Sequence, residues 1–168
     1  MDRDAPEPLC FVLSDLVADE AARAFAEHER RIRESLSDVE VRHRGGSSLP
    51  GVLTMGDVDV HVRVDRLAFP AARDCLLELY EPLYPDVWHS DGAFYCAPGS
   101  EPRVEVALTA RGSLDDFHHG EAWDWIAADA ALLERYNALK REHEGGSVDA
   151  YLAAKRAFFY SLRDDQAR

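Results

Sequence analysis

Two short motifs of the sequence have residue types and spacing suited to metal and phosphate chemistry. A glycine pair, Gly45-Gly46, is followed after ten residues by Asp57 and Asp59. Two residues separated by one position on a strand project from the same face, with backbones about 7 Å apart, so both carboxylates can hold one divalent ion or a pair. Glycine lets the backbone approach a phosphate without a Cβ in the way.

A third acid can complete this site from a neighbouring strand. Glu105 lies in the segment 104–108, where apolar residues alternate as in a strand. Magnesium prefers hard oxygen ligands in octahedral geometry, supplied by carboxylates together with substrate phosphates. The pattern therefore predicts a site for Mg²⁺, or Mn²⁺, that binds a triphosphate, with Ser47 or Ser48 as an additional hydroxyl donor.

Each of the three motifs, taken alone, also has a purely structural interpretation. The chain has 32 Asp and Glu residues, so the aspartate pair can be solvated surface, Gly-Gly-Ser can simply connect two elements, and Glu105 can be an exposed strand residue. The order of the three motifs along one chain favours the metal site.

The hydrophobic pattern predicts the elements that must position these motifs. Val58, Val60, Val62 and Val64 alternate with polar residues, which is typical of a strand with one buried face. Helices take over after Ser113, so the order of elements predicts a single α+β domain with a small mixed sheet. The predicted elements are helices over 19–36, 67–80, 121–143 and 148–164, strands over 39–43, 58–64, 93–96 and 104–108, the last two joined as a hairpin, and a proline-rich segment 81–88 without assignment.

The net charge argues against a nucleic-acid partner. The 168 residues include 19 Lys and Arg against 32 Asp and Glu, a net charge of −13, and such an excess of carboxylates repels a phosphate backbone. Small or cationic substrates fit better. With 46% apolar residues, the chain can bury a substantial core.

Cysteine usage and hydropathy predict a cytoplasmic protein. Cys10, Cys75 and Cys96 form no CxxC pair, so a disulfide framework and a structural zinc site are not expected. The N-terminus is acidic and no apolar run reaches 18 residues, which predicts neither a signal peptide nor a membrane span.

Several other side chains are assigned to structure rather than chemistry. His61 shares the face of the two aspartates and is interpreted as an exposed strand residue, with a supporting role in the site as the alternative. The adjacent His118 and His119 lack a third partner at ligand spacing. Cys75 and Cys96 lie in apolar surroundings and are expected in the core.

The motifs resemble the polymerase-β-type nucleotidyltransferase superfamily and, within it, the GrpB family. Segment 43–52, HRGGSSLPGV, is similar to the HVGSTSVPGL segment of GrpB proteins. Segments 125–140 and 149–158 are similar to the family's C-terminal patterns RDYLRAHPELAxxYxxLK and YxxxKxxF, so the resemblance spans about residues 39–160. It implies a minimal nucleotidyltransferase fold, a small mixed β-sheet flanked by helices with a helical C-terminal part, in one domain over 1–168 whose residues 1–8 are flexible.

The chain departs from the GrpB pattern at informative positions. Arg44 replaces an apolar residue, Trp123 stands where the family tends to have Arg, and Arg103 with Glu105 stands where it tends to have a His-x-His pair. Many relatives keep only the aspartate that matches Asp59. This chain has the full acidic set of catalytic superfamily members, which favours a working metal site.

The resemblance implies a division of labour in the site. Asp57 and Asp59 hold the metal on the triphosphate, while Glu105 either binds a second metal or acts as general base on the acceptor. Negative charge that builds on the α-phosphate needs a nearby cation. The nucleotide-binding set comprises Gly45, Gly46, Ser47 and Ser48, with Arg44, Arg103, Lys140 and Lys155 as the candidate cations.

These observations predict a Mg²⁺-dependent nucleotidyltransferase that moves a nucleoside monophosphate from a nucleoside triphosphate to a hydroxyl or amine of a small molecule, such as an aminosugar. A non-catalytic nucleotide- or metabolite-binding protein of the same fold is the first alternative. A structural or regulatory partner in a small complex is the second, supported only by the aromatic C-terminal helix.

Overall fold

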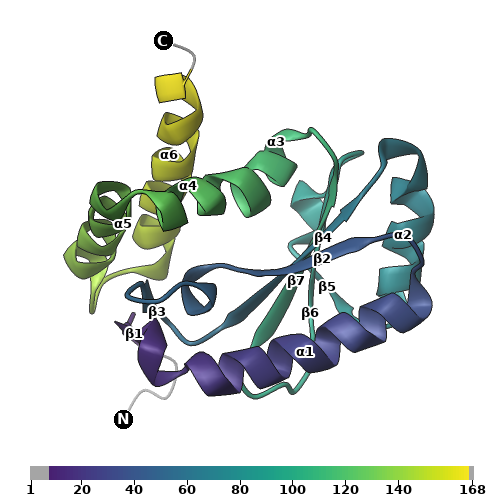
Figure 1. Ribbon diagram of the computed structural model, residues 1–168, viewed down its shortest axis with the longest axis horizontal. Coiled ribbons are helices and arrows are strands. Elements are labelled where there is room, and N and C mark those ends of the chain that lie inside the picture. The colour runs from purple at the N-terminus through teal and green to yellow at the C-terminus, as the bar shows by residue number, and fades with distance from the viewer. Residues whose placement is uncertain (1–7, 167–168) are drawn as a thin grey trace.

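A five-stranded sheet forms the centre of the fold in this computed structural model, which describes residues 8–166 (Figure 1). The predicted flexible segment 1–8 lies outside the described residues except for its last residue. Strand β4 runs parallel to β7, and the other neighbours are antiparallel, so the predicted mixed sheet of an α+β fold is confirmed. The strands, in spatial order, are β2 (Glu40–Arg44), β4 (Val58–Val64), β7 (Val104–Ala110), β6 (Gly92–Cys96) and β5 (Glu81–Leu83).

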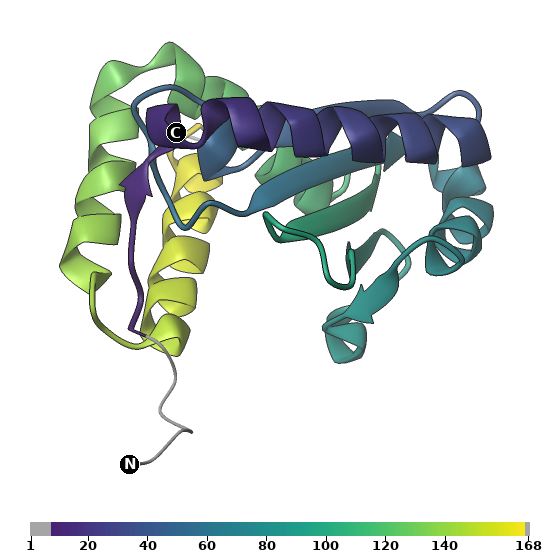
Figure 2. The ribbon, with the colours of Figure 1, turned by 90° about the horizontal axis from the view of Figure 1, so that it is seen from below.

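Two helices cover one face of this sheet. Helix α1 (Ala18–Ser35) lies along it and α2 (Phe69–Leu77) packs at its end (Figure 2). The four valines of β4 point to this face, and each is at most 2% exposed. Burial of this apolar set fixes the register of β4, because a slip of one residue would turn the whole set to the other face. The residues between the valines, Asp59 among them, consequently lie on the opposite face.

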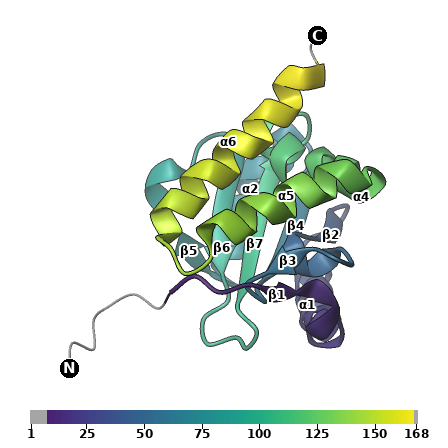
Figure 3. The same cartoon turned by 90° about the vertical axis from the view of Figure 1, so that its left-hand side faces the viewer.

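The C-terminal helices build a second core beside the sheet. Helix α4 (Ala122–Ala128), α5 (Ala130–His143) and α6 (Val148–Gln166) pack around Tyr136 and Val52, and Figure 3 shows them crossing in front of one end of the sheet. The prediction of one helix over 121–143 is wrong. Asp129 has extended backbone angles and its carboxylate accepts hydrogen bonds from two amides of α5, so it ends one helix and caps the next.

The other elements of the fold are short. The unassigned proline-rich segment contains the edge strand β5, where Pro82 needs no ladder hydrogen bond. The remaining short elements are β1 (Val12–Leu13), its partner β3 (Leu53–Thr54), α3 (Leu114–Asp116), the π-helical turn η5 (Phe117–Glu121), and the 3₁₀ turns η1 (Ser14–Leu16), η2 (Gly46–Ser48), η3 (Arg66–Ala68) and η4 (Pro85–Val87).

Two further expectations concern the cysteines and the membrane-spanning helices. The three cysteines are free, but Cys75 and Cys96 are half-buried rather than in the core. Cys96 pairs with Glu105 in the β6–β7 register and so lies on the open face of the sheet. Within residues 8–166, no helix combines the length and the apolar character needed to cross a membrane.

Candidate active site

The register of the sheet brings the three predicted acidic residues together. Asp59 pairs with Glu105 on β7 and with Arg44 on β2. Asp57 directly precedes β4, and its charge acts on Asp59. All three acidic residues are half-buried. The open face of the sheet therefore carries a group of three carboxylates at the end where the chain enters β4 and β7.

Asp59 is the most perturbed of these carboxylates. Burial, and next the negative charge of Asp57, raise its pKa to about 7, although Lys155 lowers it. The carboxylate is thus costly to ionise in the unliganded protein. A divalent cation bound there would favour the ionised form.

Position 45 must be a glycine because its backbone lies against the carboxylate of Asp59. Its φ is +78°, in the region that glycine adopts without strain. A Cβ placed on Gly45 would lie 1.7 Å from Asp59 Oδ2 and 2.6 Å from its Cγ. The backbone of the predicted phosphate-binding turn therefore lies directly against the predicted metal ligand, and no side chain fits between them.

The two serines of this turn hydrogen-bond within the protein. Ser47 is buried, and its hydroxyl donates to the carbonyl of Asp57 over 2.7 Å, with His43 Nε2 3.0 Å from the same hydroxyl. The hydroxyl of Ser48 donates to the carbonyl of Gly45 over 2.7 Å. Each hydroxyl has one proton to donate, so Ser47 holds the turn to the start of β4 and Ser48 closes the turn on itself. Contact of either serine with a phosphate stays a prediction.

Two lysines of the C-terminal helices approach the acidic group. Lys140 on α5 is 3% exposed, donates to the carbonyl of Leu53 and lies 4.5 Å from the centre of the Tyr136 ring. Its Nζ would be 3.1 Å from a Cβ on Gly46, so the lysine packs directly against the turn. Burial, and next the charge of Lys155, lower the pKa of Lys140 to about 7.

Lys155 on α6 differs in its environment. Burial opposes its charge, but Tyr151 and the three carboxylates outweigh burial and raise its pKa. Lys155 therefore stays protonated beside the acidic group, where it can neutralise charge that develops on a phosphate.

The two predicted arginines are paired with acids. Arg44 is 9% exposed and donates two hydrogen bonds to Asp124 of α4, over 2.8 and 3.2 Å. Arg103 donates to Glu105 over 2.7 Å while remaining largely exposed. Arg44 therefore ties α4 to the sheet, and Arg103 holds the third carboxylate; their roles toward a phosphate stay predictions.

A cavity of about 230 Å³ opens beside the carboxylates. Asp59 and Glu105 lie at its wall together with Arg44 and Arg156, and its other walls come from β5, β6, η4 and η5. Arg156 and the apolar residues of β5 and β6 were not among the predicted site residues. The hairpin of strands 93–96 and 104–108 was predicted without a register, and the pairing of Phe94 with Ala107 and of Cys96 with Glu105 in the structure is what places Phe94 on the face of Glu105.

The prediction that His61 is an exposed strand residue is wrong. His61 is 1% exposed, and its Nε2 lies 2.8 Å from the hydroxyl of Thr109. The turn η5 covers it, because Gly120 packs against the imidazole and His119 lies with its ring centre 5.9 Å away. Burial lowers the pKa of His61 well below its usual range and that of His119 to about 4, so both rings are neutral near pH 7.

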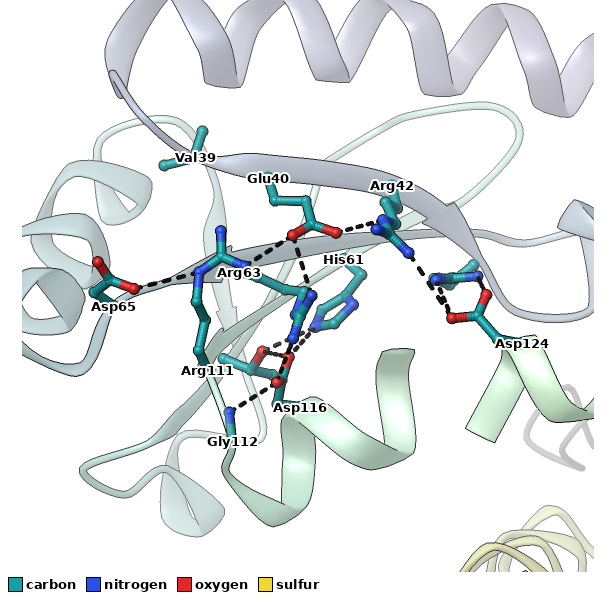
Figure 4. A network of polar contacts seen from close by, with 12 residues as sticks. Val39, Glu40, Arg42, His61, Arg63, Asp65, Arg111, Gly112, Asp116 and Asp124 are labelled. Carbon is teal, nitrogen blue, oxygen red and sulfur yellow. Dashed lines mark hydrogen bonds and ion pairs between the residues drawn. The ribbon is translucent and has the colours of Figure 1, made fainter. Parts of the chain in front are cut away.

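An ion-pair network holds η5 over the sheet (Figure 4). The guanidinium of Arg63 donates to both oxygens of Asp116, and to Glu40 over 3.1 Å. Asp116 also accepts from the amide of Gly112 over 2.9 Å. Burial opposes ionisation of Asp116, but Arg63 outweighs it and lowers the pKa of that carboxyl. The network therefore anchors the turn that carries His119.

The described residues contain no ready-made metal cage. Between residues 8 and 166, no three or more His, Cys, Asp and Glu side chains converge in an arrangement that could hold a metal ion. The three carboxylates therefore form at most part of a coordination sphere, which a triphosphate and water would complete.

Comparisons with known proteins agree on one family. A family model described as GrpB protein matches residues 17–164. A UPF0157 protein of Vibrio cholerae is 27% identical over 148 residues, covering 88% of this chain and 78% of its own. The crystal structure of a conserved GrpB protein from Enterococcus faecalis superposes with a TM-score of 0.66 at 16% identity, covering 88% of this chain and 95% of that one.

A larger enzyme shares the fold. A structure of Cid1, described by its RNA terminal uridylyl transferase activity, matches with a TM-score of 0.51 at 13% identity, covering 77% of this chain and 41% of that one. The chain thus has a nucleotidyltransferase-like fold, and the match covers less than half of Cid1.

Proposed function

Because this chain belongs to the GrpB family and has a nucleotidyltransferase-like fold, we propose that it is a nucleotidyltransferase dependent on Mg²⁺ or Mn²⁺. It moves a nucleoside monophosphate from a nucleoside triphosphate to a hydroxyl or amine of a small molecule. One observation carries the proposal: the glycine turn packs against Asp59, which in turn pairs in register with Glu105. This joins a phosphate-binding backbone to metal-binding carboxylates in one site.

The residues present fit a divalent cation. Because Gly45 has no side chain, the carboxylate of Asp59 lies directly against the backbone of the turn, where a Cβ would otherwise be. The donors are carboxylate oxygens, which Mg²⁺ and Mn²⁺ prefer. Asp57 and Asp59 would hold the ion. When bound, the ion neutralises charge on the phosphates and orients the triphosphate for displacement.

The remaining residues position the substrates and handle the proton. In the transfer, the acceptor atom forms a bond to the α-phosphorus, the bond from that phosphorus to the bridging oxygen breaks, and pyrophosphate leaves. The acceptor's proton passes to Glu105 acting as general base; the alternative role of Glu105 is to bind a second ion. Lys155 lies beside the carboxylates, where its positive charge stabilises the developing negative charge. The pKa of Lys140 is lowered to about 7, and the negative charge of a bound triphosphate would favour its protonated form beside the turn.

A small acceptor is favoured over RNA. Cid1 acts on RNA, but this chain has a net charge of −13, which disfavours a polyanion. We therefore propose a small-molecule acceptor, no nucleic-acid or membrane partner and a cytoplasmic location.

A non-catalytic role in nucleotide or metabolite binding is the second candidate. The ion pair between Arg103 and Glu105 favours it, because the guanidinium already occupies one oxygen of the carboxylate that would have to accept the acceptor's proton. Nucleotide binding without pyrophosphate release would identify this role.

Calorimetric titration tests the proposed function. ATP, CTP, GTP and UTP are each titrated with Mg²⁺ into the wild type, Asp57→Asn, Asp59→Asn and the control Asp65→Asn. Asp65 follows β4 on the same face, and its side chain is 83% exposed. We expect metal-dependent binding of at least one nucleotide, lost in Asp57→Asn and Asp59→Asn and kept in the control. Because the pKa of Asp59 is raised, the neutral amide should not destabilise the fold, so lost binding is not explained by unfolding.

Acceptor screening for pyrophosphate release follows for the nucleotide that binds. If no nucleotide binds, or if the two site variants bind as well as the wild type, the three carboxylates are surface residues and the enzymatic proposal fails.

A further inference from the structure

The cavity beside Glu105 has an apolar half that the proposed chemistry leaves unused. Across the open face, His61, Ala107, Phe94 and Leu83 pair from strand to strand. The small side chain of Ala107 lies between two rings, so it leaves a depression in the sheet. The ring of His119 covers this depression, with its centre 5.5 Å from that of Phe94.

The outer wall of the depression is apolar and exposed. Tyr84 and Val87 line the cavity and are 56% and 55% exposed. Tyr84 also has a left-handed backbone, with φ of +50°, a conformation that is costly for a bulky residue. The indole of Trp88 donates to the carbonyl of Leu83 over 2.9 Å and fixes this segment. The structure thus keeps two large apolar side chains at the mouth of a cavity instead of burying them.

The geometry of phosphoryl displacement determines which substrate this half can hold. Attacking and leaving oxygens lie roughly in line through the phosphorus. The phosphate-binding turn follows β2 on one side of Asp59, and Glu105 lies on the other side. A triphosphate on the turn therefore places its leaving group toward β2, and the attacking group arrives from the side of β7, β6 and β5. That is the side on which Phe94, Tyr84 and Val87 lie.

We propose that the acceptor of this enzyme is a flat aromatic or heteroaromatic alcohol or amine, packed in the cavity against the wall that Phe94, His119 and Tyr84 form, with its reactive group at Glu105. Aromatic side chains favour stacking or edge-to-face contact with a ring. Among the described residues that line the apolar half there is no carboxylate, and α6 contributes the positively charged side chain of Arg156 to the cavity wall. These surroundings disfavour a cationic sugar. A volume of about 230 Å³ is below the roughly 300 Å³ at which drug-sized pockets begin, which limits the acceptor to one or two rings.

This inference rests on the proposed function, and the test separates the two. Tryptophol, an aromatic alcohol, and glucosamine, a cationic sugar, are compared as probes by saturation-transfer NMR. Each is added to the protein alone and with Mg²⁺ and a non-hydrolysable analogue of the nucleotide that binds in the calorimetric titration. The variants are Val87→Glu, which puts a charge at the cavity mouth, and the control Leu67→Glu, at a residue 98% exposed and outside the cavity.

We expect tryptophol to bind the wild type and Leu67→Glu equally well. It should bind Val87→Glu about ten-fold more weakly, because a carboxylate replaces an apolar contact. It should also stay bound to the wild type when the nucleotide analogue is added. Displacement of tryptophol by the analogue would overturn the inference and identify the cavity as the seat of the nucleobase. Binding of glucosamine in place of tryptophol would also overturn it. Failure of all four nucleotides to bind, by contrast, overturns the proposed function and with it the acceptor role.

Discussion

The contact between Gly45 and Asp59 predicts a large effect from adding one methyl group. In Gly45→Ala the new Cβ would lie 1.7 Å from Asp59 Oδ2, whereas Cβ atoms essentially never approach another heavy atom within 3.0 Å. The carboxylate must therefore retreat by about 1.3 Å, the difference between 1.7 and 3.0 Å. The backbone of Gly45, with φ of +78° and ψ of −175°, lies in a region essentially restricted to glycine and costs alanine about 1–3 kcal/mol, and overpacking against Asp59 adds about 1–3 kcal/mol.

Gly51 supplies the matched control for this substitution. It also has a positive φ, of +75°, but nothing lies within 4 Å of its ideal Cβ. Gly51→Ala should therefore lose only the backbone component of about 1–2 kcal/mol. Urea unfolding followed by tryptophan fluorescence gives the free energy of unfolding of both variants. If the proposed function holds, pyrophosphate release should fall about 100-fold in Gly45→Ala, because a displacement near 1 Å disrupts positioning, and stay unchanged in Gly51→Ala.

A double-mutant cycle identifies the atoms responsible. Asp59→Ala removes Oδ2 and Cγ, the two atoms nearest to the added methyl group. In that background, the cost of Gly45→Ala should fall toward the cost of Gly51→Ala. Equal unfolding free energies for Gly45→Ala and Gly51→Ala in the wild-type background would refute the close contact on which the candidate site is built.

Three further predictions concern polar groups that the structure buries wholly or in part. Asn137 on α5 is 3% exposed; its side-chain amide donates to the carbonyl of Gly51 and accepts from the N–H of Leu53, over 2.8 Å each. Asn137→Ala leaves both backbone groups unpaired, so we expect the free energy of unfolding in urea to fall by about 2–3 kcal/mol. A loss below about 0.5 kcal/mol would contradict this. Arg63→Met should cost about 3 kcal/mol because it leaves the buried carboxylate of Asp116 unpaired, and adding Asp116→Leu should recover most of the loss; no recovery would argue against the pair. Burial lowers the pKa of His43 from 6.5 to about 4, so the unfolded state binds more protons between these two values and stability falls as the pH drops from 6.5 toward 4. The urea midpoint, measured at several pH values, should therefore fall less steeply with decreasing pH in His43→Gln than in the wild type. An identical pH dependence in the two proteins would refute the lowered pKa of His43. Burial lowers the pKa of four other histidines in the same direction, namely His28, His61, His118 and His119.

Local patterns were sufficient for most of the elements. The alternation of valine and polar residues predicted β4 with its observed bounds, Val58–Val64, because one buried face imposes a period of two. The apolar spacing of 19–36 predicted α1 to within one residue at each end. The break at Asp129 was missed, since the helical pattern continues on both sides and only the capping geometry interrupts it.

Sequence alone was sufficient to select the glycine turn and the aspartate pair as candidate phosphate and metal ligands, because their spacing is short and set by one strand and one loop. Tertiary structure decided what surrounds them. The pairing of Asp59 with Glu105 depends on a parallel register between strands distant in the chain, and the approach of Lys140 to Gly46 depends on how α5 packs. Likewise, His61 is buried only because η5 folds over it. Such contacts join segments that no local periodicity relates, so the cavity and its charges exist only in the folded chain.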